Sequence, residues 1–458
     1  MSEGPTGERS ARVRPLSGFP EWLPSQRIVE LEVLDSIRRT FELHGFASVE
    51  TRAVEPLEQL LRKGDIDKEV YVLRRLHAAD DEGDAGLGLH YDLTVPFARY
   101  VLENAGRLEF PFRRYQVQKV WRGERPQEGR YREFLQADVD VVDRDTLAFH
   151  HEVELPLVVA EALGRLPIPP VRIQVNNRKL AEGFFRGAGA SDPAAALRAV
   201  DKLDKVGPDR VRAMLVAEAG LTDAAARLCI DLASSQAADA SFADRVRALG
   251  VSDPLLDVGL EELVRVVDAG AERAPGLLVA DLRIARGLDY YTGTVYETQL
   301  LGHESLGSVC SGGRYDSLAS DGRSTVPGVG VSIGVSRILG RLFGQDLLGA
   351  SRSVPSAVLV AVVDEASRRR SDDVATALRA RGVPCEVAPA AARYGRQIRH
   401  ADRRGIPYVW FPPADEGEPH SVRDIRSGEQ VEADPARWVP PDDDRWPRTV
   451  TSTEEQQP

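Results

Sequence analysis

Cysteine is scarce in this 458-residue chain, and the scarcity argues against two kinds of site. Cys229, Cys310 and Cys385 lie far apart and in no C-x-x-C spacing, so neither a disulfide framework nor a cysteine-ligated metal site is expected. Small buried thiols are the expected alternative. No apolar run approaches the ~18 residues of a membrane-spanning helix. The N-terminal residues include acids and no apolar stretch, unlike a secretory signal or transit peptide. We therefore expect a cytoplasmic protein without a membrane segment or a bound metal.

Lysine is also scarce: arginine supplies 53 of the 59 basic residues, so an isolated arginine is weak evidence for a phosphate site. The formal net charge of −12 argues at first against a nucleic-acid partner. The charge is unevenly distributed, however. Residues 112–134 carry 7 basic and 3 acidic residues, residues 393–404 carry five arginines and one aspartate, and residues 414–458 carry 12 acids and 5 arginines. Since a local basic surface matters more to a polyanion than the global sum, nucleic acid stays a candidate partner.

The length is about three times the ~150 residues of one domain, which predicts two or three domains. We expect a flexible leader at 1–20 and a main domain at 21–348 with an Ala-rich helical insertion at about 180–275. Strands alternate with helices over 355–434, which predicts a small, mostly parallel α/β domain. The Pro- and Asp-rich residues 435–458 are expected to be a disordered tail.

Within the main domain, periodicity predicts amphipathic helices over 27–44 and 89–103. Residues 114–121 and 134–143 are predicted to be two strands of a hairpin with an arginine-rich loop between them. Strands separated by glycine-rich turns are expected from 278 to 336.

The first segment with chemical potential is Trp121-Arg122-Gly123-Glu124. Its cation and carboxylate are two residues apart, which in a strand places both on one face. Arg122 could hold a phosphate through two hydrogen bonds, Glu124 could bind an amine, and Phe134 could stack on a base. A solvated, salt-bridged hairpin explains the same residues, and composition alone favours that alternative.

Two further segments are rich in glycine. Residues 286–297 (RGLDYYTGTVYE) suit a β-strand whose glycines admit a ligand or a neighbouring backbone, although the segment alone is more typical of an ordinary strand. Residues 307–318 (GSVCSGGRYDSL) and 328–337 (GVGVSIGVSR) mix small and apolar residues. Their glycines have neither the Walker spacing nor G-x-G-x-x-G between a strand and a helix, so neither a P-loop nor a Rossmann site is expected.

Taken together, these segments resemble the histidyl-tRNA synthetase family of class II synthetases. FRRYQVQKVWRGERPQEGRYREFLQADVDVV is similar to the second class motif and VGVSIGVSR to the third, while RGLDYYTGTVYE and SGGRYDSL resemble two signatures of the histidine enzymes. LHYDLTVPFARYV, VNNRKL, DKLDKVG and VRDIRSGEQ are supporting matches. The resemblance runs from about Gly18 to Asp434. It implies an α+β fold: an antiparallel-sheet class II catalytic domain with a helical insertion, then a small α/β anticodon-binding domain.

The resemblance also implies an activity, that of a histidine–tRNA ligase. Such an enzyme activates L-histidine with ATP and Mg²⁺ and transfers it from histidyl-adenylate to tRNA(His), as a homodimer. Arg122 and Arg286 would be the catalytic residues that hold the α-phosphate from two sides. Glu124 would read the adenine amino group, and Phe134 and Arg337 would sandwich the ring. Mg²⁺ would arrive with ATP rather than in a dedicated protein site.

The implied histidine pocket has three parts. Asp92, Thr94 and Gln136 would bind the ammonium group. Asp140 and Tyr291 would face the imidazole. The wall would be formed by Tyr290, Tyr315, Gly312 and Gly313. A pocket that leaves buried polar groups unpaired with the wrong amino acid discriminates by roughly 10⁴ or more, so no editing domain is expected.

Three positions depart from the family's pattern. Arg52 stands where the first class motif ends in proline, Ser336 stands where an acid usually precedes the third-motif arginine, and residues 410–413 (WFPP) replace a stretch with Gly and Glu. Two alternatives therefore stay open: a paralogue that activates histidine without charging tRNA, and the histidine-sensing regulatory subunit of ATP phosphoribosyltransferase. The segment 357–434 and the presence of Arg286 argue against the second.

Overall fold

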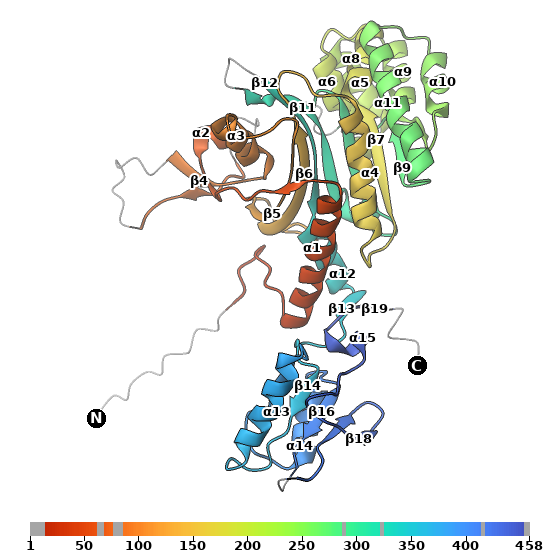
Figure 1. Ribbon diagram of the computed structural model, residues 1–458. Helices are drawn as coiled ribbons and strands as arrows, with labels where there is room; N and C mark the ends of the chain where they lie inside the picture. The colour runs from red at the N-terminus through yellow and green to blue at the C-terminus, as the bar shows by residue number, and fades with distance from the viewer. Residues whose placement is uncertain are drawn as a thin grey trace, which may run out of the picture. The chain divides into compact units, whose positions relative to one another are not determined.

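A computed structural model describes residues 14–61, 68–76, 86–285, 290–320, 325–413 and 417–452. The chain forms two compact units, drawn in Figure 1. Unit one comprises residues 1–20 and 37–341, and unit two comprises residues 21–36 and 342–458. Helix α1 (Pro24–Leu43) begins in unit two and ends in unit one. Within the described ranges, no helix combines the length and the apolar character needed to cross a membrane.

Unit one is built on a nine-stranded sheet in the order β1-β5-β6-β12-β11-β10-β7-β9-β8. The pairs β1–β5 and β7–β9 are parallel, and the other pairs are antiparallel. The bounds are β1 (Ala47–Ser48), β5 (Phe112–Trp121), β6 (Glu133–Val142), β7 (Val171–Asn177), β8 (Gln236–Ala237), β9 (Leu278–Asp281), β10 (Thr294–Leu300), β11 (Cys310–Ser320) and β12 (Thr325–Gly334). The predicted α+β fold with an antiparallel-rich sheet is confirmed.

The predicted hairpin of β5 and β6 is also confirmed. The two strands pair over their full length, from Phe112 opposite Val142 to Trp121 opposite Glu133. Successive side chains of a strand point to opposite faces of the sheet. In β6 the odd-numbered residues from 135 to 141 are apolar, whereas residues 136, 138 and 140 are polar. One face of the sheet therefore belongs to the core, and the other is polar. Helix α4 (His150–Gly164) packs against β6, β7 and β12 (Figure 1).

Seven helices occupy the region expected to be a helical insertion: α5 (Arg178–Gly187), α6 (Pro193–Val200), α7 (Leu203–Val206), α8 (Pro208–Ala219), α9 (Asp223–Ala233), α10 (Ser241–Ala248) and α11 (Pro254–Arg273). Helices α5 and α11 cross closely because each has a glycine at the contact. A Cβ atom on Gly183 would lie 2.2 Å from the amide nitrogen of Leu256, and one on Gly259 would lie 2.1 Å from that of Leu180. Helix α11 also packs on β7 and β9, which anchors the helices to the sheet.

A small region beside the large sheet contains β2 (Val54–Pro56), α2 (Leu57–Leu60), β3 (Val72–Leu73), β4 (Leu87–Leu89) and α3 (Thr94–Asn104). Strands β2, β4 and β3 pair in that order. The helix expected from residue 89 starts later because residues 87–89 pair with β2. The apolar face of α3 packs against Tyr315 and Leu318 of β11.

The expected leader is only partly covered by the structure. Residues 1–13 lie outside the described residues. The Gly18 carbonyl accepts hydrogen bonds from the amides of Arg132 at 2.6 Å and Glu133 at 3.2 Å, and the Phe19 ring lies 6.2 Å from that of Tyr71. A flexible leader is therefore wrong for residues 18–19, because backbone hydrogen bonds fix them beside the loop of the hairpin.

Unit two holds a five-stranded sheet in the order β15-β14-β16-β17-β18. The bounds in unit two are α12 (Val335–Gly344, shared with unit one), β13 (Leu348–Ala350), β14 (Val358–Val360), α13 (Arg368–Ala380), β15 (Cys385–Val387), α14 (Tyr394–Asp402), β16 (Tyr408–Phe411), β17 (Ser421–Asp424), β18 (Gln430–Glu432), α15 (Asp442–Arg445) and β19 (Thr449–Thr451). Strand β14 is parallel to β15 and β16, but β17 and β18 pair antiparallel. The expected parallel arrangement therefore holds only for the first three strands.

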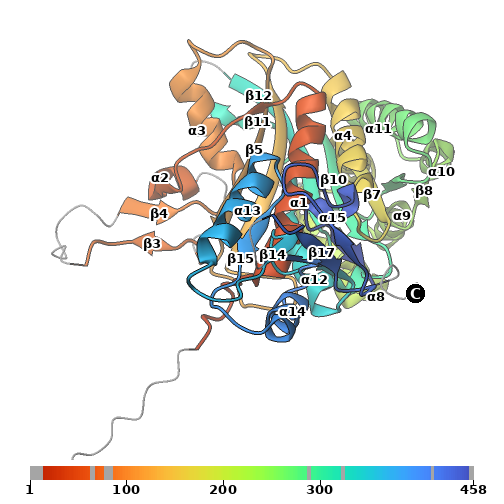
Figure 2. The same ribbon diagram turned by 60° about the horizontal axis from the view of Figure 1, so that its bottom comes forward.

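Both faces of this second sheet are covered by a helix (Figure 2). Val358 and Val360 of β14 pack with Leu378 of α13, whereas Leu359, between them, packs with Ala401 of α14. The continuous apolar run of β14 is thus explained, because a strand covered on both faces needs no polar side.

The expected disordered tail is wrong over residues 435–452. Strand β19 pairs antiparallel with β13, and the Asp444 carboxylate of α15 accepts a hydrogen bond from the Tyr408 hydroxyl at 2.7 Å. The Trp438 ring meets those of Tyr408 and Trp410 edge-on, at 5.3 and 5.6 Å. Acidic, proline-rich composition predicted disorder, but a few aromatic and charged contacts fix this segment.

Candidate functional site

The polar face of the large sheet gathers most of the predicted site residues of unit one. Because β5, β6, β12 and β11 pair in register, Arg114 lies opposite Asp140, Asp140 opposite Gly330, and Gly330 opposite Gly313. The next row on the same face consists of Gln116, Asp138, Ser332 and Ser311. Polar side chains therefore form a band over four strands, with glycines in its first row.

A cavity of about 210 Å³ opens beside this band. It is lined by four of the predicted ATP-binding residues, by the predicted histidine-binding Gln136, and by nearby backbone and polar groups: Arg122, Glu124, Gly129, Arg130, Tyr131, Phe134, Gln136, Ser308, Val309, Cys310, Ser311, Ser332, Gly334 and Arg337. Segments that are some 200 residues apart in the sequence thus meet around one space, as the resemblance implied.

Arg122 lies between two aromatic rings at the cavity. Its Cζ atom is 4.4 Å from the ring centre of Tyr91 and 5.1 Å from that of Phe134, which is cation–π geometry. The Glu124 carboxylate lies 3.9 Å from Arg122 and 3.5 Å from Arg130. Arg122 and Glu124 follow the end of β5, so the prediction that they share one face of a strand is wrong. The irregular backbone after Trp121 turns both side chains into the cavity.

Arg337, in the first turn of α12, also lines the cavity. Its guanidinium donates a hydrogen bond to the Leu306 carbonyl. The preceding Ser336, one of the three departures, accepts a hydrogen bond from the Leu135 amide at 2.9 Å. The Ser336 hydroxyl therefore links the first turn of α12 to β6 at Leu135, the residue after Phe134.

Asp140 is buried and has two strong partners. Its Oδ2 atom lies 2.8 Å from Nη2 of Arg114, and its Oδ1 accepts a hydrogen bond from the Tyr315 hydroxyl at 2.8 Å. The Tyr315 ring stacks on that of Tyr290 at 5.9 Å, and Tyr290 meets Tyr291 edge-on at 5.0 Å. Three tyrosines therefore lie together beside the buried carboxylate of Asp140.

Two predicted ammonium-binding residues stand at the start of α3. Asp92 is 3% exposed, and its Oδ1 accepts a hydrogen bond from the Val95 amide at 3.0 Å. Thr94 is the first residue of the helix.

Burial is the main cause that raises the pKa values of Tyr290 and Tyr291, and the charges of Asp92, Asp138 and Asp140 raise them further. The two hydroxyls are thus protonated at neutral pH and able to donate hydrogen bonds.

Residues 286–297 were expected to form a β-strand, and this prediction is wrong for Tyr290 and Tyr291. Residues 290–293 precede β10, which begins at Thr294. The buried Glu152 of α4 fixes this start, because its Oε2 accepts hydrogen bonds from the Thr294 amide at 3.0 Å and the Thr294 hydroxyl at 2.6 Å. Its Oε1 pairs with Arg314 at 2.8 Å. Sequence reasoning missed Glu152, because it lies among polar neighbours in HHEVE and nothing in that local sequence indicates burial.

The predicted wall glycines are required by close contacts. A Cβ atom on Gly313 would lie 2.8 Å from a ring carbon of Tyr291, and one on Gly312 would lie 2.1 Å from the Gly330 carbonyl oxygen. A Cβ atom on Gly328 would lie 2.4 Å from the Tyr315 ring. The glycine strings therefore make room for the tyrosines of the pocket.

Two charged residues at the centre of the band were not predicted. Arg114 is completely buried, and its guanidinium also lies 4.1 Å from the ring centre of Phe97. Asp138 is 1% exposed, and burial raises its pKa to about 7, although the charge of Arg114 opposes the shift. For Asp138 alone a signal was present in the sequence, since the polar residues of ADVDVV alternate with apolar ones on a strand.

Arg286, the second predicted catalytic residue, and residues 287–289 lie outside the described residues. They are bracketed by Ala285, which is buried, and by Tyr290 of the pocket.

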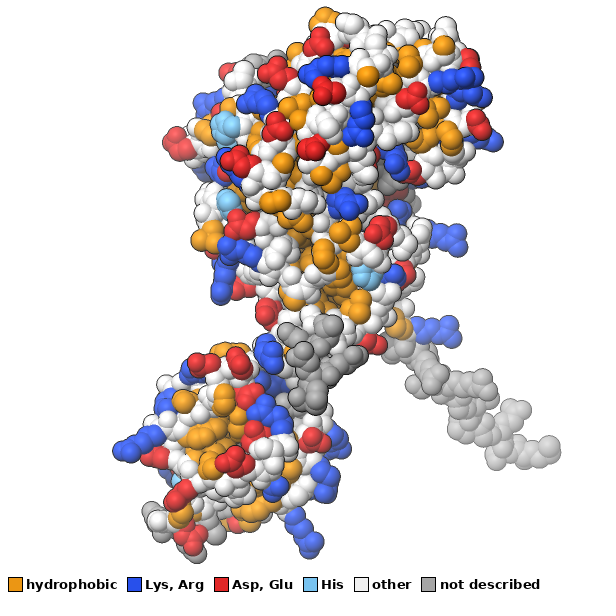
Figure 3. All heavy atoms as spheres, turned by 90° about the vertical axis from the view of Figure 1, so that its right-hand side faces the viewer, with side chains coloured by type: hydrophobic (Ala, Val, Ile, Leu, Met, Phe, Trp, Pro, Cys, Tyr) orange, Lys and Arg blue, Asp and Glu red, His pale blue; other side chains and the backbone are white. Residues whose placement is uncertain are grey.

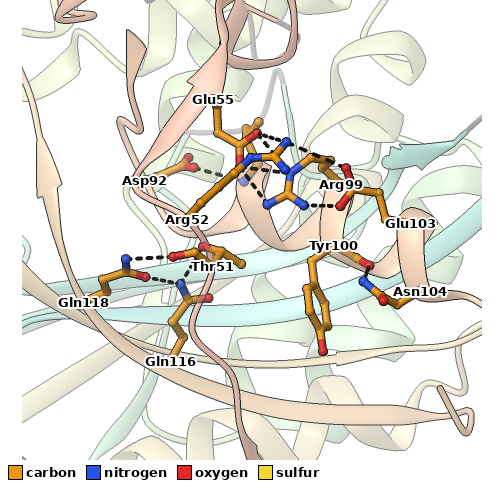
Figure 4. A network of polar contacts seen from close by, with 11 residues as sticks. Thr51, Arg52, Glu55, Asp92, Arg99, Tyr100, Glu103, Asn104, Gln116 and Gln118 are labelled. Atoms are coloured by element: carbon orange, nitrogen blue, oxygen red, sulfur yellow. Dashed lines mark hydrogen bonds and ion pairs between the residues drawn. The ribbon is translucent and has the colours of Figure 1, made fainter. Parts of the chain in front are cut away.

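Arg52, the departure in the first class motif, belongs to an ion-pair network (Figure 4). Its guanidinium lies 3.2 Å from Glu55 and 3.7 Å from Glu103. Glu55 is completely buried and is bound on its other side by Arg99 at 2.8 Å. The neighbouring Thr51 hydroxyl accepts a hydrogen bond from the Gln116 side chain at 2.9 Å. The loop that lacks the proline is thus fixed by charge pairs and by a link to the polar band.

A family model described as "Histidyl-tRNA synthetase" matches residues 18–338, and one described as "Anticodon binding domain" matches residues 357–438. The chain belongs to the histidyl-tRNA synthetase family. The resemblance seen in the sequence is therefore confirmed. A "Histidine--tRNA ligase" of Cutibacterium acnes is 61% identical over 450 residues, covering 96% of this chain and 99% of that protein. One of Micrococcus luteus is 58% identical over 454 residues, covering 96% and 99%.

Solved structures agree with this family assignment. The histidyl-tRNA synthetase from Nostoc sp. PCC 7120 superimposes with a TM-score of 0.82 at 34% identity, covering 93% of this chain and 97% of that one. A protein titled "ATP phosphoribosyltransferase regulatory subunit/histidyl-tRNA synthetase" from Bacillus halodurans C has a TM-score of 0.71 at 18% identity, with coverage of 86% and 97%. At 18% identity, the likeness to the Bacillus halodurans protein shows a common fold and no more.

Proposed function

We propose that this chain is a histidine–tRNA ligase that forms histidyl-adenylate from L-histidine and ATP and then transfers histidine to tRNA(His). The observation that carries the proposal is the continuity of two sites. Gln136 lines the cavity with Arg122 and Phe134, and it shares a strand face with Asp138 and Asp140. A nucleotide in the cavity and an amino acid over Asp140 would therefore be neighbours, which is what adenylate formation requires.

In the first step, the histidine carboxylate attacks the α-phosphorus of ATP in line and pyrophosphate leaves. Arg122 and Arg286 stabilise the negative charge on the α-phosphate oxygens from two sides. Phe134 and Arg337 hold the adenine ring between them, with Arg337 in a cation–π contact. Glu124 accepts a hydrogen bond from the adenine amino group. The described positions of Arg122, Glu124, Phe134 and Arg337 around one cavity support these roles.

Mg²⁺ would enter with the β- and γ-phosphates of ATP and neutralise part of their charge. Among the described residues, no group of three His, Cys, Asp or Glu side chains is placed to hold a metal ion by itself. Mg²⁺ commonly keeps several water ligands and is held through substrate phosphates rather than by a protein cage.

In the proposed pocket, some residues bind the polar groups of histidine and others form the wall. Asp92, Thr94 and Gln136 would bind the ammonium group, and Asp140 and Tyr291 would bind the two imidazole nitrogens. Tyr290, Tyr315, Gly312 and Gly313 would form the wall. The ion pair with Arg114 and the Tyr315 hydrogen bond support the role of Asp140, because they hold its carboxylate in one orientation.

The second unit would bind the anticodon of tRNA(His). Helix α14 and its flanks present four exposed arginines to solvent, namely Arg393, Arg396, Arg399 and Arg403. On the face drawn in Figure 3, by contrast, basic and acidic side chains are interspersed without a large patch of one sign. Unpaired anticodon bases are read by hydrogen bonding and stacking, and nearby arginines neutralise the phosphates.

The assembly and the location of the protein are further parts of the proposal. A homodimer is expected because the segment 49–52 resembles the family's dimer-forming motif except at Arg52, and light scattering of the purified chain measures it. The dimer would work in the cytoplasm, where tRNA is charged. We also propose the domain limits 21–348 for the catalytic core and 355–434 for the anticodon-binding domain.

Paired assays on matched variants test the proposed function. The wild-type chain should catalyse histidine-dependent pyrophosphate exchange and charge tRNA(His). Arg122→Ala should lower the exchange rate by ~10²–10³, the typical cost of losing one preorganised charge contact. Arg125→Ala, an exposed arginine of the same loop that does not line the cavity, is the control and should stay near wild type. Exchange without charging would identify a paralogue with another acceptor. Absence of both activities would refute the ligase.

A further inference from the structure

Asp138 is a buried carboxyl group for which the ligase mechanism has no role so far. It is 1% exposed, and neither of its oxygens has a hydrogen-bond partner of ordinary geometry among the described residues. Its strand neighbours on the same face are Gln136 and Asp140, and it lies opposite Gln116 on β5 and Ser332 on β12. An unpaired buried carboxylate is costly, so Asp138 must be protonated or meet a positive charge.

Apart from Arg114, the described groups around Asp138 are acidic or neutral. Three carboxyl groups and one guanidinium face the centre of the pocket, with neutral hydroxyl and thiol groups between them: Asp92, Asp138, Asp140 and Arg114, then Tyr290, Tyr291, Ser332 and Cys310. Burial raises the pKa values of Tyr290, Tyr291 and Cys310, so these three stay uncharged. This described set thus contains three acidic groups and one guanidinium, and the proposed catalytic Arg286 lies outside the described residues.

Arg114 can compensate only one of the three carboxylates. Its Nη2 atom is 2.8 Å from Asp140, and it lies directly opposite Asp140 in the sheet. Asp140 is therefore the ionised partner. Asp92 binds the Val95 amide at the start of α3, where the helix dipole favours a negative charge. Asp138 has neither an ion pair nor a backbone donor among its described neighbours, so it is the group on which a proton is retained.

We propose that Asp138 couples histidine binding to the release of a proton: it is protonated in the empty pocket and ionises when the ammonium group of histidine enters, while Arg114 keeps Asp140 ionised. The inference rests on the proposed histidine-binding function. Asp138 acts through the charge of the pocket and is a positioning residue. The ammonium group brings a positive charge into the pocket, which makes the ionised form of Asp138 favourable.

The sign of the pH dependence follows from this coupling. Burial raises the pKa of Asp138 to about 7 in the empty pocket, and a bound cation lowers it. The complex therefore holds fewer protons than the empty protein near neutral pH. Histidine binding should tighten as the pH rises through about 7 and should level off above it. At pH 7 about half of the empty molecules hold the proton, so binding should release about half a proton per site.

Calorimetric titration of the full chain tests the proposal. Binding is measured at pH 7 in two buffers of different ionisation enthalpy, which gives the number of protons released. Histidine itself titrates near pH 6.5. The probe is therefore triazolylalanine, a histidine analogue whose ring stays neutral in this range. Wild type should release about half a proton, Asp138→Asn should release almost none, and the control Asp143→Asn, at the end of β6, should match wild type.

A second variant keeps the test decisive if Asp138→Asn does not fold. Ser332 lies opposite Asp138 on β12, and its hydroxyl lowers the pKa of Asp138 although it forms no hydrogen bond of ordinary geometry with the carboxylate, so Ser332→Ala should move the pH of half-maximal proton release upward. Equal proton release by wild type and Asp138→Asn, or no shift with Ser332→Ala, would overturn the coupling while histidine still binds. If wild type binds no histidine and supports no exchange, the proposed function itself fails, which is a different result.

Discussion

Gly330→Ala is the substitution for which the structure makes the sharpest prediction. A Cβ atom at position 330 would lie 1.9 Å from Oδ1 of Asp140, whereas real contacts of this kind essentially never fall below 3.0 Å. The carboxylate must therefore move by at least about 1.1 Å, the difference between these distances. This movement breaks the geometry of both the Arg114 ion pair and the Tyr315 hydrogen bond, each 2.8 Å long.

The expected cost is divided between stability and histidine binding. Inserting a methyl group into a closely packed site typically costs about 1–3 kcal/mol of stability. Misplacing a charged hydrogen-bonding group that recognises the substrate costs about 1.5–3 kcal/mol. The second cost corresponds to an increase of about 10- to 150-fold in the KM for histidine. The KM for ATP should change little, because Gly330 does not line the cavity that holds the predicted adenine-binding residues.

Pyrophosphate exchange at varied histidine and ATP concentrations, together with thermal unfolding, measures these quantities. The control is Gly164→Ala at the end of α4, where a Cβ atom would meet nothing within 4 Å. Alanine there should keep both KM values and should not lower stability, since alanine is favoured over glycine in a helix by ~1 kcal/mol. A folded Gly330→Ala protein with an unchanged KM for histidine would refute the assignment of Asp140 to the histidine pocket.

Three further predictions concern other parts of the chain. Arg286→Ala should lower the single-turnover rate of adenylate formation by ~10²–10³ while histidine binding measured by calorimetry stays nearly unchanged, and Arg286→Lys should also be strongly impaired because a point charge cannot replace the planar fork. Ser336→Ala removes the acceptor of the Leu135 amide and should raise the KM for ATP several-fold, measured by exchange, with the KM for histidine unaltered. Trp438→Ala should destabilise unit two, as monitored by hydrogen exchange of β16.

The sequence alone was sufficient for the parts of the fold with strong local patterns. The hairpin of β5 and β6 was predictable because β6 alternates polar and apolar residues, and its motif also matched a known family. The cavity residues came from that resemblance, since nothing local indicates that Phe134 and Arg337 line one space. Conversely, the positions of Arg122 and Glu124 on a strand face were wrong, because strand periodicity does not reveal where β5 ends.

Buried charges were the least predictable feature of the site. Arg114 is the second of two consecutive arginines in FRRYQ, and in a chain where arginine is the usual cation it looks like a solvated side chain. Its burial depends on Asp140, which is opposite it only because of the strand register. The pairing of residues 26 positions apart fixes the charge of the pocket, and composition and spacing within one segment contain no such information.

A few contacts order the polar residues 435–452, and the substitution Trp438→Ala tests how much these contacts contribute to stability. The Trp438 ring packs against Tyr408 and Trp410, and its carbonyl accepts a hydrogen bond from Arg381 at 2.6 Å. Truncating a packed tryptophan typically costs ~3–5 kcal/mol, and about the lower figure is expected here because the ring is only partly buried. Trp446 is 57% exposed, so Trp446→Ala is the matched control and should have little effect. If hydrogen exchange of β16 is equally slow in both variants, the packing of Trp438 contributes nothing to the stability of unit two. Faster exchange in Trp438→Ala alone would show that these residues complete the hydrophobic core of the second sheet.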